Sequence, residues 1–207
     1  MITKRLVCSN LLICMVVLSS CGTLNYVPDE GWPDQSDSKF YEDWFGKQLA
    51  AASEPVLANK QDLGPYANRF RLMVLPSFSH TSVYRIDETD TGAMRLTYTL
   101  LDGAGGYEPG RIAVKVQRYL TPGETGAFLA VLNEARLPSA QPEADLRVKV
   151  DENGDEFITI CGDGTQIVVE RLSPLQRSFI TRHECELERF PEINDLYTFV
   201  SALNVSN

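Results

Sequence analysis

The chain has 207 residues, with 28 acidic and 19 basic side chains and a formal net charge of −9. Such a balance repels phosphate backbones and anionic headgroups, so nucleic acid is not expected as a partner. The length suffices for a single domain with an ample hydrophobic core, preceded by a shorter segment.

The first twenty residues have the composition of an export signal. Lys4 and Arg5 provide a positive start, residues 11–18 are apolar, and small residues follow. The apolar run is too short to cross a bilayer, which requires roughly twenty residues. Residues 18–21 read Leu-Ser-Ser-Cys and resemble a bacterial lipobox. This resemblance implies cleavage before Cys21 and lipids on Cys21 that anchor the chain to a membrane.

The predicted domain organisation follows from this anchor. Removal of the signal peptide, residues 1–20, changes the net charge from −9 to −11, because two basic residues and no acidic residues leave. Residues 21–38 are expected to hold the lipidated Cys21 and a flexible tether that reaches roughly 50 Å when extended. Residues 39–207 are expected to form one domain. By resemblance to Gram-negative lipoproteins, Gly22 in place of Asp indicates the outer membrane, on its periplasmic face.

A short helix is predicted over 38–49, where aromatic residues recur at helical spacing, although Gly46 weakens it. The aromatic stripe is typical of a core contact, and a ligand site is the less favoured interpretation. A covering loop follows over 53–68. The stripe consists of Phe40, Trp44 and Gln48, flanked by Tyr41, Phe45 and Leu49.

Alternating polar and apolar residues predict four strands with short connections, which is typical of an antiparallel meander. A helix is then predicted from Thr121, because Thr121 can cap it, Pro122 suits its first position and Glu124 can bond back to the cap amide. The four strands lie at 69–75, 82–87, 93–101 and 112–120.

Three further strands are predicted at 146–150, 157–161 and 166–171, the first two joined by an Asn153-Gly154 turn. Helical spacing returns at 191–203, whereas 172–190 is ambiguous. The fold class is therefore α+β: an antiparallel sheet, with a meander of four strands plus a three-strand meander, packed with two to three helices.

Two cysteines remain for the mature domain, because Cys8 and Cys14 leave with the signal and Cys21 would carry lipid. We favour a disulfide between Cys161 and Cys185, which would close a loop and contribute on the order of 3 kcal/mol. The alternative is two separately buried thiols.

No metal or cofactor is predicted. The acidic stretch 151–162 resembles a calcium loop, but Glu156 stands where the turn needs Gly, and Gly162 where a bidentate Glu belongs. Zinc is not expected, because His80 and His183, the two histidines, lie about a hundred residues apart.

The glycine-rich stretch 102–110 is the most unusual part of the domain. A phosphate-binding loop is not expected, because a strand rather than a helix follows it. The favoured interpretation is a wide connection whose glycines, Gly105 and Gly106 among them, supply unusual backbone angles. A binding loop that presents Tyr107 is the open alternative.

Two other groups of residues are candidate sites. His80 lies among hydroxyl residues, but no Gly-x-Ser-x-Gly elbow accompanies it and no third catalytic member can be named. Charged residues from several predicted elements could converge, but a solvated rim is favoured. These residues are Glu54, Arg85, Glu170 and Arg171.

Several motifs together resemble an uncharacterised family of bacterial envelope proteins, over about residues 40–175. The resemblance implies the fold and the domain limits, and it implies no activity. The chain departs from the family at Phe157, where relatives carry Trp, and at Gln166-Ile167, where they carry an aromatic-His step. The motifs are Glu54-Pro55-x-Leu57, Arg69-Phe70-x-Leu72, Phe78-x-His80, Val83-x-Arg85-Ile86, the most specific segment LDGAGGYxPG at 101–110, and Val169-Glu170-Arg171-x-Ser173-Pro174.

The leading functional hypothesis is a lipid-anchored, non-enzymatic periplasmic module that binds a protein, such as an inhibitor, an immunity protein or an envelope-assembly accessory. A small-molecule or glycan-binding lipoprotein that uses the Gly-rich loop is the alternative, and an envelope hydrolase built around His80 is less favoured. An exposed apolar surface would support the first, and a pocket lined by Trp44 and Tyr107 the second.

Overall fold

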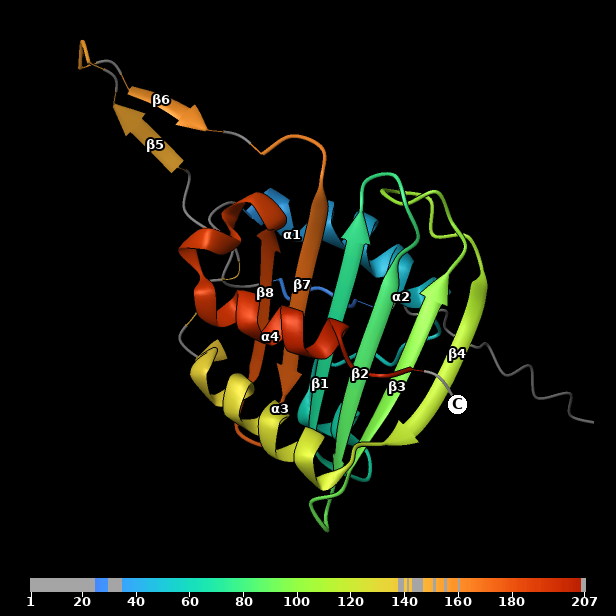
Figure 1. The fold of residues 1–207 in the computed structure, drawn as a ribbon. Helices are drawn as coiled ribbons and strands as arrows, with labels where there is room; N and C mark the ends of the chain where they lie inside the picture. The colour runs from blue at the N-terminus through green and yellow to red at the C-terminus, as the bar shows by residue number, and fades with distance from the viewer. Residues whose placement is uncertain are drawn as a thin grey trace, which may run out of the picture.

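The computed structural model describes residues 25–29, 35–137, 140, 142, 147–150, 152–154, 156–159 and 161–205. Its centre is a six-stranded antiparallel sheet in the order β4-β3-β2-β1-β7-β8 (Figure 1). The predicted α+β class is therefore confirmed. The strands are β1 (Tyr66–Pro76), β2 (Ser82–Thr89), β3 (Met94–Leu101), β4 (Ile112–Tyr119), β7 (Thr165–Leu172) and β8 (Arg177–His183).

The predicted meander of four strands is present as β1 to β4, but the three-strand meander is not. β7 pairs with β1, and its other neighbour is β8, which lies in the segment left ambiguous by its sequence pattern. β5 (Arg147–Val150) and β6 (Glu156–Thr159) form a separate two-stranded hairpin, which extends away from the sheet (Figure 1).

Two helices cover one face of the sheet, α3 (Pro122–Glu134) and α4 (Pro191–Ser201) (Figure 1). α3 begins with the predicted reciprocal cap: Thr121 Oγ1 accepts from the Glu124 amide and Glu124 accepts from the Thr121 amide. A short 3₁₀ helix, η4 (Glu184–Arg189), joins β8 to α4. The core on this face includes Phe128 and Leu132 of α3, Ile193, Leu196 and Val200 of α4, and Phe70, Leu72, Ile86, Leu96, Ile167 and Val169 of the sheet.

A second helical layer lies on the other face of the sheet (Figure 1). It runs from α1 (Gln35–Tyr41) through a π-helical turn, η1 (Glu42–Gly46), into α2 (Lys47–Ala51). The predicted covering loop follows and contains a 3₁₀ turn, η2 (Lys60–Leu63). The core on this face includes Tyr41, Phe45 and Leu49 of the helical layer and Met73, Leu75, Val83, Val168 and Phe179 of the sheet.

The Glu42 carboxylate lies against Gly46. A Cβ atom at Gly46 would lie 2.3 Å from this carboxylate, so any larger residue at position 46 would displace it. Single π-helical turns of this kind often occur at functional sites.

The prediction of a flexible tether over 21–38 is wrong for the residues of this range that the structure describes. Tyr26 and Val27 are each 3% exposed and belong to the core beneath the second helical layer. Helix α1 also begins at Gln35, inside the predicted tether. Short polar segments can be ordered by long-range contacts that composition does not reveal.

The predicted signal peptide, residues 1–20, and the lipid site Cys21 lie outside the described residues. Among the helices that the structure describes, none has the length and hydropathy needed to cross a membrane.

Candidate functional site

The Gly-rich loop between β3 and β4 has backbone angles that residues other than glycine rarely adopt. Gly105 and Gly106 have φ angles of 90° and 53°. A Cβ atom at Gly105 would lie 2.5 Å from the carbonyl oxygens of Pro76 and Ser79. The loop is therefore pressed against the end of β1 and the β1–β2 connection, which confirms the unusual backbone predicted for these glycines.

The second helical layer clamps this loop. Trp44 Nε1 and Gln48 Nε2 both donate to the carbonyl oxygen of Gly106, at 2.9 and 2.8 Å. On its other side, the Gly106 amide donates to the Pro76 carbonyl at 3.0 Å. Trp44 and Gly106 are 62 residues apart, so the predicted aromatic stripe and the predicted binding loop meet only in the folded chain.

Three rings gather where helix and loop meet, and we call Phe40, Trp44 and Tyr107 the aromatic surface. Their ring centroids lie 5.7 Å apart for Phe40 and Trp44, 5.4 Å for Trp44 and Tyr107, and 6.5 Å for Phe40 and Tyr107. Phe40 is 47% exposed and Tyr107 is 53% exposed. The core interpretation of the stripe is therefore confirmed for Tyr41, Phe45 and Leu49, and Gln48 is buried as well. Trp44 is half-buried, and Phe40 faces solvent.

Two of the three rings of the aromatic surface, those of Phe40 and Tyr107, are about half exposed to solvent. Phe78, on the β1–β2 connection against which Gly105 packs, is 78% exposed. Two cavities among the described residues, of about 260 and 380 Å³, lie elsewhere. The first is lined by Pro28, Arg177 and Phe179 among others, and the second by Glu134, Arg136 and Glu192.

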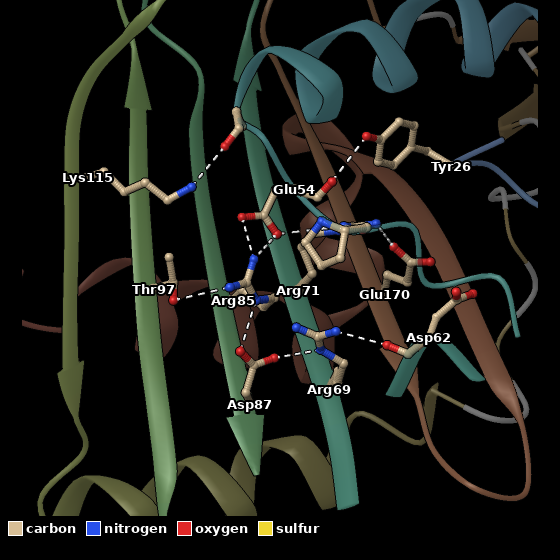
Figure 2. Close-up of polar contacts among 12 residues, drawn as sticks. Tyr26, Glu54, Asp62, Arg69, Arg71, Arg85, Asp87, Thr97, Lys115 and Glu170 are labelled. Atoms are coloured by element: carbon tan, nitrogen blue, oxygen red, sulfur yellow. Dashed lines mark hydrogen bonds and ion pairs between the residues drawn. The ribbon is translucent and has the colours of Figure 1, made fainter. Parts of the chain in front are cut away.

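The same face of the sheet carries a buried network of charges, shown in Figure 2. Arg85 donates through Nη1 to both carboxylate oxygens of Glu54 at 2.8 Å and through Nε to Asp87 at 3.0 Å. Asp87 also accepts from Arg69 Nε at 2.8 Å. Arg71 donates to Glu170, and its Nη1 lies 3.7 Å from Glu54. Each of these side chains is at most 10% exposed.

Ion pairing favours the charged forms of Asp87 and Arg85 in this network. Burial would raise the pKa of Asp87, but the hydrogen bond from Arg69 and the charge of Arg85 outweigh it, and the pKa is lowered. Burial opposes the charge of Arg85, yet Glu54 and Asp87 raise its pKa. In this network of ion pairs, which runs from Arg69 to Glu170, every charged side chain has a partner of opposite charge.

The sequence favoured a solvated rim for four charged residues. This prediction is wrong for Glu54, Arg85 and Glu170, which are 5%, 6% and 1% exposed. Arg171 pairs in register with Phe70 and therefore lies on the opposite face. The signal was present in the strand pattern. The positions that alternate with the apolar face of β1 and β2 include Arg69, Arg71, Arg85 and Asp87, which indicates a second covered face.

The two cysteines of the domain lie as a disulfide requires. Cys161 and Cys185 are at bonding distance, with their Cα atoms 6.3 Å apart. His183 lies beside them, and the three potential ligand atoms fall within 4.8 Å of one another. Its Nδ1 accepts from the Cys185 amide at 3.2 Å and so caps η4. The wide sequence separation of the histidines concealed this grouping.

His80 holds loops together. Its Nδ1 lies 2.9 Å from the Gly103 carbonyl oxygen, and the side chain is exposed. Ser77 Oγ instead bonds the Gly164 carbonyl at 3.0 Å. In the part of the chain that the structure describes, no hydrogen bond joins His80 to a hydroxyl or a carboxylate.

Comparison of the chain with models of known protein families gives no match, and comparison with curated proteins gives none either.

Proposed function

We propose that this chain is a lipid-anchored protein of the bacterial envelope whose aromatic surface binds another protein. The observation that carries the binding role is the group of exposed rings on a rigid base. Phe40 and Tyr107 are about half exposed, and Trp44 beneath them is fixed by its bond to the Gly106 carbonyl. Large rings with little conformational freedom to lose are typical anchors of protein interfaces.

The exposure of Phe40 and Tyr107 favours a protein over a small molecule or glycan as the ligand. Small-molecule sites are usually concave and bury most of the ligand. The cavities at Pro28 and at Glu134 contain no ring of the aromatic surface. An open group of rings instead resembles the centre of a protein interface before a partner covers it.

The anchoring part of the proposal rests on the lipobox-like Leu-Ser-Ser-Cys at 18–21 and on the export-type composition before it. The resemblance to a family of envelope proteins agrees with this location and remains part of the proposal. No catalytic role is proposed for His80.

Tyr107→Ala tests the binding role. Because Tyr107 is 53% exposed, its removal should leave the melting temperature within a degree or two, whereas capture of the envelope partner by in-cell crosslinking should fall at least tenfold. Tyr119→Ala is the matched control, because Tyr119 is 61% exposed and lies on the edge strand β4. Equal capture by both variants and the wild type would exclude the aromatic surface as the binding site.

A further inference from the structure

The N-terminal segment at Tyr26 and Val27 is docked onto the domain by specific bonds. Both backbone amides donate to one carboxylate oxygen of Glu42, at 2.8 and 2.7 Å. Arg177 donates to the Tyr26 carbonyl, and the Tyr26 hydroxyl donates to the Glu54 carbonyl at 3.1 Å. Figure 2 shows Tyr26 reaching from this segment toward Glu54.

This docking is built into the second helical layer. Glu42 reaches the segment from the π-helical turn, and Gly46 leaves the space that its carboxylate occupies. The Arg71 guanidinium lies 5.9 Å from the centroid of the Tyr26 ring, which adds a cation–π contact to the burial of that ring. The segment is therefore a strap, defined here as Tyr26 and Val27, that ties the N-terminus to the buried charge network.

The strap shortens the distance available to a lipid anchor. From Cys21 to Tyr26 the chain has five steps, which span at most roughly 18 Å. A free tether to Ser38 would span roughly 50 Å or more. With lipids on Cys21, the side of the domain that carries the strap must lie close to the bilayer surface.

The aromatic surface is on the same helical layer as the strap. Trp44 packs against the same apolar cluster that contains Tyr26 and Val27. Phe40 and Trp44 lie two residues from Glu42, so their rings project from the other side of this helical segment. We infer that the strap presents the aromatic surface beside the membrane, where it binds a protein held in that same membrane. This inference rests on the proposed function. The bilayer itself is a poorer occupant, because the processed chain would carry a net charge of −11 and repel anionic headgroups.

The inference can be tested in the intact, lipidated protein by lengthening the segment between Cys21 and Tyr26, which we call the leash. We would insert about twelve Gly and Ser residues after Gly22, which lengthens the leash by up to roughly 40 Å. A photoreactive phenylalanine analogue at position 107 would then report the partner in growing cells. Crosslinking to a membrane-held protein should fall about sixfold, because effective concentration falls with roughly the 3/2 power of leash length.

Two matched controls isolate the leash. The same insertion between Asn153 and Gly154, at the tip of the β5–β6 hairpin, should leave crosslinking unchanged. Glu42→Ala should release the strap and lower crosslinking as the insertion does, whereas Asp43→Ala, at the adjacent exposed carboxylate, should not. Hydrogen exchange at the Tyr26 and Val27 amides would verify that the strap opens only in Glu42→Ala.

The remaining outcomes overturn the inference separately from the proposed function. Equal crosslinking with both leashes, a water-soluble partner, or crosslinking to lipid would each refute a membrane-held protein partner while the anchor and the aromatic surface stand. A chain that carries no lipid at Cys21 would instead refute the anchored function on which the inference rests.

Discussion

At the scale of single residues, the Gly-rich loop shows how a missing side chain fixes a site. The Gly105 backbone lies against two carbonyl oxygens, and its φ of 90° is one that other residues rarely adopt. The exposed position of Tyr107 depends on this close approach. The backbone requirement at Gly105 is thus separate from the proposed partner contact at Tyr107, two residues further on.

Gly105→Ala should therefore destabilise the domain by roughly 1–3 kcal/mol in denaturant unfolding, because both the φ angle and the new Cβ are unfavourable. Gly126→Ala is the control. No heavy atom lies within 4 Å of a Cβ at Gly126 in α3, so alanine there should stabilise the domain by up to about 1 kcal/mol. A neutral Gly105→Ala would show that the loop relaxes freely.

Glu124 should make stability depend on pH in the acid range. The hydrogen bond from Arg118, together with the Thr121 amide, lowers the pKa of Glu124 from 4.5 to about 2. Because the unfolded state binds this proton more readily, the stabilisation is present above about pH 4.5 and is lost as the pH falls toward 2. Glu124→Gln should flatten the unfolding free energy in this window. An unchanged slope between wild type and variant would contradict this role.

At the scale of elements, the sheet has two covered faces of different chemistry. One face of β1 packs Phe70 and Leu72 against α3 and α4. The other places Arg69 and Arg71 in the charge network beneath the second helical layer and its following loop. A buried network of this kind is costly to break and adds little stability over an apolar core, so it favours one defined register of strands, loop and strap.

Glu170→Ala should destabilise the domain by about 3–5 kcal/mol, because it leaves Arg71, 2% exposed, without its closest carboxylate. Glu184→Ala, at an exposed position of η4, should change stability by less than about 0.5 kcal/mol. Chemical denaturation of both variants provides the comparison. If Glu170→Ala and Glu184→Ala were equally stable, Glu54 alone would be enough to balance the buried charge of Arg71.

At the scale of the whole molecule, the proposed anchor and the strap act in series. The lipid on Cys21 would hold the chain to the membrane, and the strap would set which side of the domain faces it. Cys21→Ser should move the protein from the membrane fraction to the soluble fraction or leave an unprocessed precursor.

Wild-type protein should sediment with the outer membrane in a sucrose gradient, because Gly22 rather than Asp follows Cys21. Unchanged membrane retention of Cys21→Ser, or recovery of the wild type with the inner membrane, would contradict these expectations.

The sequence by itself determined what depends on neighbouring residues. Thr121, Pro122 and Glu124 specify the start of α3, because a cap is closed by hydrogen bonds within one turn. Alternation specifies β1 to β4, and short connections specify their antiparallel order. The glycine at 105 was readable as a backbone requirement for the same reason.

Only the tertiary structure decided which distant residues meet. The pairing of β7 with β1, the clamp of Trp44 and Gln48 on Gly106, and the strap on Glu42 join residues 15 to 103 positions apart. Such contacts form because burial on both sheet faces rewards them collectively, and no local pattern encodes which partner each residue will find. The aromatic surface and the charge network exist for that reason only in the folded chain.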